Sequence, residues 1–273
     1  MLWLAKSSVL CFTLWISVYS YAATVAIYPK PESSSDARVD YPLQLLKAAL
    51  GDSYELKPAT VTMQQGRAVK QLAAQRMVDV LWTGTSIERE HLLLPIRIPI
   101  YKGAIGKRVL LIHERNKDQF DKVQTIDDLR AFRAVQGGSW PEVDIYRHNE
   151  MNITANYNYE AMFQMLVKGR VDYFPRSVIE VWGEYERYKD QGIIVDSHLS
   201  IQYPFVFYFF VNKSNIELHS AIKSGLERMI ESGEYDQLFQ EHQQRHLDRA
   251  ELGGKNIIYL DNPAFPIGSP SNY

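Results

Sequence analysis

The chain has 273 residues, of which 46% are hydrophobic and 23% are charged. These proportions are typical of a globular protein and exclude a disordered or fibrous chain. Thirty basic and 32 acidic side chains give a net charge of −2, so the chain lacks the basic excess with which proteins bind nucleic-acid phosphates. The length is enough for one large domain or for two modest lobes, each with its own core.

The N-terminal segment 1–22 has the pattern of a secretory signal peptide. Lys6 supplies a positive charge, residues 7–21 contain no charge, and Ser20 and Ala22 place small residues at the positions that precede a cleavage site. The uncharged run is short for a membrane span, which needs about 20 residues. We therefore expect cleavage after Ala22 and export to the periplasm, with an uncleaved membrane anchor as the alternative.

The single cysteine of the sequence, Cys11, lies inside this leader. The exported chain is therefore expected to contain no disulfide and to depend on an apolar core for its stability, which suits a periplasmic protein of this size. No later apolar run approaches the length of a membrane span.

After the leader, short β-rich runs alternate with amphipathic segments of helical period, which is typical of an α/β fold. The expected strands cover residues 24–28, 54–57, 78–82, 109–113, 134–136, 153–157, 171–174, 193–196 and 205–211, with a further edge strand at 257–260. The expected helices cover residues 41–50, 69–77, 159–166, 177–190, 218–229 and 235–242, and two more begin near Thr125 and Pro141. This order favours parallel strands joined by crossover helices.

Three segments have a characteristic order and spacing. In residues 78–89, a strand is followed by small polar residues and an arginine; residues 168–173 read Lys-Gly-Arg-Val-Asp-Tyr; and residues 226–235 form a helix that ends in Gly-Glu-Tyr. Together they resemble the periplasmic solute-binding proteins of the family 3 type, which supply polar amino acids to ABC transporters. The resemblance covers most of residues 24–245.

The resemblance implies a type II periplasmic binding-protein fold, in which two α/β lobes are joined by two hinge crossings. Lobe 1 is expected to comprise residues 23–112 and 205–273, and lobe 2 residues 113–204. The crossings are expected near residues 110–114 and 200–207. In such folds the ligand lies at loops and helix ends that face the cleft, and closure of the lobes is the functional event.

Arg89 is the first candidate for a ligand contact. In the resembled family, the arginine of this motif binds the ligand carboxylate, a task that suits a planar and permanently charged guanidinium. The alternative is a surface arginine paired with a neighbouring glutamate. Thr85 and Ser86 either hydrogen-bond the ligand or cap the helix that begins there.

The turn from Ser139 through Trp140 and Pro141 to Glu142 is the second candidate. Its pattern resembles a capping box with proline in the first turn, and the free N–H groups of a helix N-terminus attract anions. The resembled family holds a carboxylate at this place with a Gly-Ser/Thr-Thr turn. Trp140 departs from that pattern and is expected to narrow the pocket or stack in it; the alternative is a structural turn with the indole packed inside the lobe.

The charge of the expected site departs from the family at Arg176. Amino acid binders of the family place an aspartate for the ligand ammonium where this chain has Ser177. Arg89 and Arg176 together would repel an ammonium and favour an anion, whereas Glu180 either restores an ammonium site or neutralises Arg176. The sequence thus predicts a carboxylate-bearing ligand and poor binding of zwitterionic amino acids.

Two further features complete the candidate residues. Tyr28 matches a position where the resembled family often places a stacking aromatic ring, and the alternative is a residue at the cleft rim. His242 and His246 have the spacing of a metal-binding helix pair, but no third ligand is evident, so a solvated helix face is the better interpretation. We expect no metal and no cofactor.

The sequence therefore predicts a monomeric periplasmic protein that captures a small polar or anionic solute for an ABC permease and is not an enzyme. Two alternatives stay open. One is a periplasmic enzyme that resembles cyclohexadienyl dehydratases, for which Glu142 or Glu180 would have to serve as the acid or base. The other is a fold retained for protein–protein interaction after loss of its ligand site.

Overall fold

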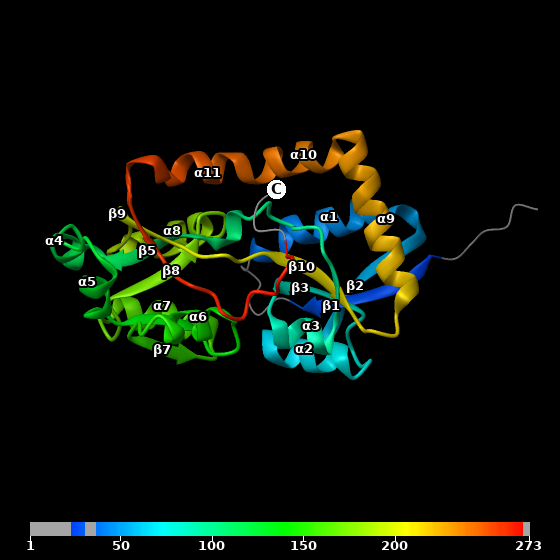
Figure 1. The fold of residues 1–273 in the computed structure, drawn as a ribbon, viewed down its shortest axis with the longest axis horizontal. Helices are drawn as coiled ribbons and strands as arrows, with labels where there is room; N and C mark the ends of the chain where they lie inside the picture. The colour runs from blue at the N-terminus through cyan, green and yellow to red at the C-terminus, as the bar shows by residue number, and fades with distance from the viewer. Residues whose placement is uncertain (1–22, 31–36, 270–273) are drawn as a thin grey trace, which may run out of the picture.

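The computed structural model describes residues 23–30 and 37–269, which form two α/β lobes lying side by side (Figure 1). The expected signal peptide lies outside the described residues. Within the described ranges, no helix combines the length and the apolar character that a membrane crossing requires.

Lobe 1 contains two small sheets. Strands β1 (Thr24–Lys30) and β2 (Tyr54–Thr62) pair in parallel, as expected. In the second sheet, β10 (Phe207–Val211) lies between β3 (Val80–Gly84) and β4 (Leu94–Ile96) and is antiparallel to both, which differs from the predicted all-parallel order. Burial of β10 explains why both of its edges are paired. Their direction follows from the connection, because the chain enters β10 directly from the second crossing and not through the crossover helix that parallel strands require.

The helices of lobe 1 are α1 (Asp40–Leu50), α2 (Gln65–Ala73), α3 (Ile87–Leu92) and α9 (Ile216–Ser232). Helix α9 packs directly on α1 because position 225 is glycine: a Cβ atom there would lie 2.0 Å from the carbonyl oxygen of Ala49. Gly233 then ends α9 in the left-handed conformation (φ +81°), as the sequence indicated.

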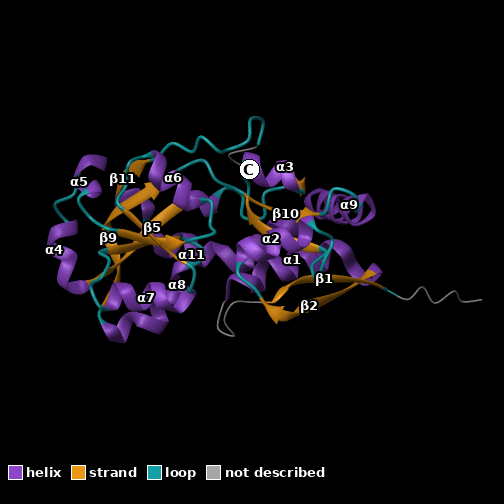
Figure 2. Cartoon of the chain, turned by 90° about the horizontal axis from the view of Figure 1, so that it is seen from below, coloured by secondary structure: helices purple, strands orange, loops and turns teal. Residues whose placement is uncertain are grey.

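Lobe 2 contains one six-stranded sheet in the order β11-β9-β5-β8-β6-β7. These strands are β5 (Lys107–His113), β6 (Ala134–Gly137), β7 (Ile153–Asn156), β8 (Tyr173–Ser177), β9 (Ile193–Gln202) and β11 (Asn256–Tyr259). Its helices are α4 (Lys117–Phe120), α5 (Ile126–Arg130), α6 (Glu142–His148), α7 (Tyr159–Val167) and α8 (Val181–Tyr188). Figure 2 shows the sheet of lobe 2 on one side and the smaller sheets of lobe 1 on the other. The capping box expected at Thr125 is confirmed, with Asp128 as its second member.

The first hinge crossing lies earlier in the chain than expected. Strand β5 belongs wholly to the lobe 2 sheet from Lys107 onward, pairing with β8 and β9 on its two sides. The crossing therefore lies between the end of β4 at Ile96 and the start of β5. The second crossing, between Gln202 and Phe207, falls inside the range that the sequence predicted. The shift arises because residues 108–112 are buried on both faces of the larger sheet.

The expected assignment of residues 253–273 to lobe 1 is wrong for β11, which pairs in parallel with the outer edge of β9. An edge strand exposes a row of unpaired backbone groups, and this late segment covers it. Beyond β11, the chain returns to lobe 1: the N–H of Ile87 donates to the carbonyl of Ala264 at 2.9 Å, and Phe265 packs on a lobe 1 hydrophobic cluster.

One long helical segment also crosses between the lobes. It consists of α10 (Glu234–Phe239), a π-helical turn (Gln240–Gln244) and α11 (Arg245–Ala250). Figure 1 shows it along the top of the molecule, with α10 beside α9 and α11 above α8. The ring of Phe239 packs against that of Tyr41 in lobe 1, and the indole N–H of Trp182 in lobe 2 donates to the carbonyl of His246 at 2.9 Å. Within the described residues the chain thus passes between the lobes four times.

Candidate functional site

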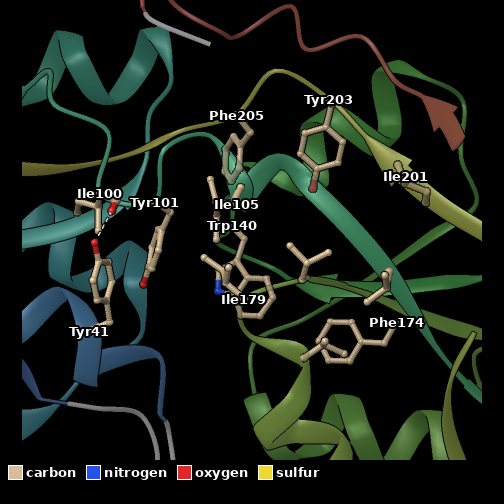
Figure 3. Packing of buried hydrophobic residues seen from close by; sticks show 14 of the residues in the cluster. Tyr41, Ile100, Tyr101, Ile105, Trp140, Phe174, Ile179, Ile201, Tyr203 and Phe205 are labelled. Atoms are coloured by element: carbon tan, nitrogen blue, oxygen red, sulfur yellow. Dashed lines mark hydrogen bonds between the residues drawn. The ribbon is translucent and has the colours of Figure 1, made fainter. Parts of the chain in front are cut away.

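A cavity of about 100 Å³ lies between the lobes. Its polar and aromatic lining comes from both sides: Lys30, Arg38, Gln65, Trp82 and Phe207 from lobe 1, Tyr101 from the first crossing, and Trp140, Glu142, Arg176 and Glu180 from lobe 2. Figure 3 shows Tyr101 of the first crossing on one side and Trp140 of lobe 2 on the other, with Phe205 of the second crossing higher in the view. A pocket that is shared by two lobes is the usual place for a small ligand.

Aromatic rings form two walls of the cavity. Trp82 is half-buried, with the ring of Tyr28 behind it at 6.0 Å between centroids. On the lobe 2 side, the ring of Trp140 stacks on Phe174 at 6.3 Å with an 18° angle between planes. Trp140 can lie flat against the backbone because residue 137 is glycine, where a Cβ atom would come within 2.3 Å of the indole. Trp140 therefore lies in the wall of the cavity, and its buried indole also packs inside lobe 2, as the alternative interpretation stated.

Beneath this wall lies a buried ion-pair network. Arg108 and Arg176 come from the adjacent antiparallel strands β5 and β8, and their side chains are only 1% exposed. Arg108 pairs with Glu142 at 2.9 Å and with Glu180 at 3.6 Å. Arg176 makes two hydrogen bonds of 2.7 Å to Glu184 and pairs with Glu180 at 3.1 Å.

The network makes the lobe 2 side of the cavity acidic. Burial disfavours the charge of Arg176, but the carboxylates of Glu180 and Glu184 outweigh this effect and raise the pKa of its guanidinium above the usual value. The network thus contains two arginines and three glutamates, which leaves an excess of one negative charge. The cation-rich cleft that Arg176 led us to expect is not formed, because Glu180 neutralises this arginine from the first residue before α8.

The lobe 1 side carries the opposite charge. Lys30 ends β1, and Arg38 lies in the short turn before α1. The guanidinium carbon of Arg38 is 4.3 Å from the ring centroid of Tyr159 and 5.4 Å from that of Trp140, so this lobe 1 side chain rests on rings of lobe 2. Lobe 1 thus contributes basic side chains to the cavity, and lobe 2 contributes an excess of acidic ones.

Arg89 does not line the cavity and differs in this from its expected role. Four of its N–H groups have protein acceptors: the Thr83 hydroxyl, the Gly84 carbonyl at 2.8 Å, the Gln65 side chain at 2.7 Å and the Ser139 carbonyl at 3.1 Å. Burial lowers the pKa of its guanidinium to about 10, which leaves the group charged at neutral pH.

The hydrogen bond from Arg89 of lobe 1 to the Ser139 carbonyl of lobe 2 joins the two lobes, and we call it the Arg89–Ser139 clasp. The prediction that these two residues meet across one cleft is confirmed. Their neighbourhood is tight, since a Cβ atom at Gly66 would lie 2.9 Å from the Cβ of Ser139. Because its donors are engaged by the protein itself, Arg89 has little capacity left for a ligand carboxylate.

The remaining predicted residues have structural roles. Ser86 caps α3 by accepting a hydrogen bond from the backbone N–H of Arg89 at 3.2 Å, and the hydroxyl of Thr85 donates to Glu90 at 2.7 Å. Ser86 follows the capping alternative, whereas Thr85 bonds to a side chain of the helix and does not cap it. Tyr28 is largely buried behind Trp82 and does not line the cavity.

The capping box expected at Ser139 is not formed. Helix α6 begins at Glu142 after Pro141, without a side-chain cap, because the carboxylate of Glu142 turns to the buried Arg108 instead. Ser177 is fully buried, and its hydroxyl donates to the Ala104 carbonyl at 3.4 Å rather than facing the cavity.

His242 and His246 are half-buried, which differs from the expected solvated helix face. His242 is partly buried because the π-helical turn that carries it lies over the interface of the lobes. The centroid of its imidazole ring is 5.7 Å from that of the Tyr41 ring. In the part of the chain that the structure describes, no three side chains gather in a way that could hold a metal ion.

Sequence reasoning missed Arg108, Arg38, Lys30 and Trp82. Arg108 did have a signal, because it stands at the start of an otherwise apolar strand, where a charge requires a buried partner. Arg38 and Lys30 lie on either side of a Ser-rich loop and carry no local pattern that predicts their position at the cavity.

The two-lobed architecture matches solved structures of periplasmic binding proteins. An ancestral arginine-binding protein bound to arginine has a TM-score of 0.62 at 16% identity, covering 81% of this chain and 99% of that chain. The ancestral amino acid-binding protein AncCDT-1, a precursor of cyclohexadienyl dehydratase, has a TM-score of 0.58 at 17% identity, covering 81% and 95%. ArgBP from T. maritima, in a mutant form, gives 0.59 at 19% identity, covering 81% and 95%.

No family model matches the sequence, and no curated protein matches it. At such low identity, the likeness to the solved structures shows the fold alone. The chain therefore has the two-lobed type II fold that the sequence predicted.

Proposed function

We propose that the chain is a periplasmic solute-binding protein that holds a small amino acid between its lobes and delivers it to an ABC permease. The observation that carries the proposal is the charge of the interlobe cavity, which is lined by basic side chains from lobe 1 and by acidic side chains from lobe 2. A zwitterion complements such a site with both of its ends. The solved structures of the same fold that bind arginine or other amino acids support this class of solute.

The charges give the solute a preferred orientation. Its carboxylate faces Lys30 and Arg38, and its ammonium faces Glu142 and Glu180 between the indole rings. Glu180 thus supplies the carboxylate that the resembled family places at the position of Ser177. This orientation replaces the earlier expectation that zwitterionic amino acids bind poorly.

The fold offers a simple mechanism for capture. A solute that contacts both lobes stabilises the arrangement in which they meet, and the Arg89–Ser139 clasp adds to the same state. The closed form is then the form that a permease recognises. The expected signal peptide places the protein in the periplasm, where it would act as a monomer.

The proposal is tested with protein purified from the periplasm and a panel of amino acids, dicarboxylates, polyamines and sugar acids. We expect an amino acid to raise the unfolding temperature in a concentration-dependent way, since a ligand at 100 times its Kd adds about 2.7 kcal/mol. Calorimetry on Glu180→Gln should show binding weakened at least about tenfold, because a charged partner is removed. Glu186→Gln, on the exposed face of helix α8, which begins directly after Glu180, is the matched control and should bind normally.

Two outcomes would overturn the proposal. In one, only dicarboxylates or sugar acids stabilise the protein; in the other, nothing in the panel does. Incubation of the best ligand with the protein also separates binding from catalysis. An unchanged proton NMR spectrum supports a binding protein, whereas loss of water or carbon dioxide from the solute would support the dehydratase-like alternative.

A further inference from the structure

A second chamber of about 240 Å³ adjoins the cavity. Arg38, Tyr101 and Glu180 line both spaces, so these three side chains form the neck between them. The first cavity alone is small, since sites for small molecules usually measure about 300–1,000 Å³. With the second chamber, the combined space reaches the lower end of that range.

The roof of the chamber is the π-helical turn between α10 and α11. This turn and the residues after it present His242, Gln243 and His246 to the chamber. π-Helical turns are rare and are frequently found at functional sites. Here the turn lies where the helical segment passes from lobe 1 to lobe 2, so its side chains cover the chamber that the two lobes share.

Gln243 is the polar group in the roof that lacks a partner. Its side chain is 5% exposed, and its Oε1 atom has no hydrogen-bond partner among the described residues. The nearby His246 is half-buried, and burial lowers the pKa of its imidazole and favours the neutral form. A buried acceptor without a donor costs free energy that a bound donor would recover.

The walls favour a cationic group. Three tyrosine rings line the chamber: Tyr41, Tyr101 and Tyr159. Of the two basic side chains, Arg187 pairs with Glu160 at 2.9 Å, and Arg38 rests on the ring of Tyr159.

Three carboxylates face the same chamber. They belong to Asp40 on lobe 1 and to Glu180 and Glu184 on lobe 2. Glu180 and Glu184 share one buried cation, Arg176, so the carboxylates remain in excess on this side of the chamber. Tyrosine faces and carboxylates attract a cation, and a guanidinium or ammonium also supplies the hydrogen that Gln243 Oε1 requires.

We infer that the second chamber receives the distal cationic group of an elongated solute, so that the protein prefers basic amino acids over neutral ones of equal length. The inference rests on the proposed function and specifies its substrate class. The α-amino acid end occupies the first cavity, and the side chain extends through the neck to Gln243.

The test compares L-arginine with L-citrulline, which has the same length but carries no side-chain charge. Calorimetry on the wild-type protein should show at least about tenfold tighter binding of L-arginine. Gln243→Leu should weaken L-arginine by about tenfold and should weaken L-citrulline as well, because the ureido group of L-citrulline also donates N–H groups to this acceptor. Equal binding of the two solutes by the wild-type protein would contradict the preference for a cationic group. Gln244→Leu is the control, because the neighbouring Gln244 is exposed and bonds to Asp248 instead.

A second variant keeps the test decisive if Gln243→Leu does not fold. Gly183 of α8 lines the chamber, and a Cβ atom at this position would meet no other atom within 4 Å. Gly183→Leu should therefore fold and occupy the chamber, excluding L-arginine while L-alanine, which needs only the first cavity, still binds.

The inference is overturned if L-alanine or another short amino acid binds as tightly as L-arginine, or if Gly183→Leu leaves L-arginine binding intact. In both cases the proposed function survives. If no amino acid binds, the proposed function itself fails and the inference falls with it.

Discussion

Two arginines buried in lobe 2 determine which charge the cavity presents. Each holds glutamates in place, so that Glu142 and Glu180 face the interlobe space as part of a rigid network. Surface ion pairs contribute little to stability, whereas loss of one partner from a buried pair leaves an uncompensated charge. The network therefore stabilises the fold and also sets the charge that lobe 2 presents to the cavity.

Arg108→Leu should lower the free energy of unfolding by about 3–5 kcal/mol, because Glu142 would remain buried without its partner. Urea denaturation followed by circular dichroism measures this loss. The control is Lys117→Met, which removes an exposed pair with Asp121 and should change stability little. Equal effects of the two substitutions would contradict a structural role for the buried network.

The burial of His246 predicts that the protein loses stability in acid. Burial lowers the pKa of this imidazole in the folded state, so the unfolded chain binds a proton more readily. Stability should therefore fall as the pH drops through the unfolded pKa of about 6.5. The nearby cations Arg245, Arg249 and His242 act in the same direction.

His246→Gln should reduce this acid sensitivity, as measured by urea denaturation at pH 7.5 and pH 5.5. The comparison must use the difference between variant and wild type, because burial also lowers the pKa of His113, which therefore contributes to the same trend. If the free energy of unfolding of the variant differs from that of the wild type by the same amount at both pH values, His246 is not the group responsible for the acid sensitivity.

At the scale of elements, the contact between α1 and α9 depends on one missing side chain. Gly225→Ala would place a methyl group 2.0 Å from the Ala49 carbonyl, and such overpacking typically costs about 1–3 kcal/mol. Gly183→Ala is the same substitution in α8 with free space around it, and helix propensity favours alanine there. Thermal unfolding should show a lower melting temperature for the first variant and no decrease for the second.

The sequence predicted most elements but not their partners. The periodicity of apolar residues identified the strands and helices, since those patterns are local. The antiparallel pairing of β3 with β10 and the addition of β11 to β9 depend on contacts between distant residues, which no local pattern encodes. The site shows the same division: the sequence identified Glu180, Trp140 and Arg176, but the pairing of Glu180 with two buried arginines required the fold.

Arg89 illustrates the limit of a family motif. The motif located Arg89 correctly at the interface between the lobes, yet the acceptors that surround its guanidinium come from three separate segments of the chain. Whether such an arginine binds a ligand or the protein itself depends on these neighbours. Its type and position in the motif do not decide between the two.

At the scale of the whole molecule, the two lobes are joined more extensively than by two hinge strands. The helix 234–250 and the segment after β11 add two further connections, and the latter is anchored on lobe 1 by Phe265. Removal of residues 260–273 should therefore allow the lobes to separate further. Replacement of the fully exposed Ile267 by alanine is the control and should have no effect.

Pulsed electron spin resonance measures this separation. The expected exported chain lacks cysteine, so spin labels can be attached at Lys70→Cys in α2 and Arg147→Cys in α6, two exposed positions on different lobes. The truncated protein should show a longer and broader distance distribution than the full-length protein. Identical distributions would mean that the C-terminal segment does not restrain the lobes.

The central claim, that a zwitterionic solute lies between the two lobes, is tested most directly by a crystal structure with the best-stabilising amino acid. We predict that its ammonium lies within hydrogen-bonding distance of Glu142 or Glu180, between Trp82 and Trp140, while the guanidinium of Arg89 keeps its bond to the Ser139 carbonyl. A solute whose carboxylate binds Arg89 in place of Ser139, or one bound outside the interlobe cavity, would contradict the account.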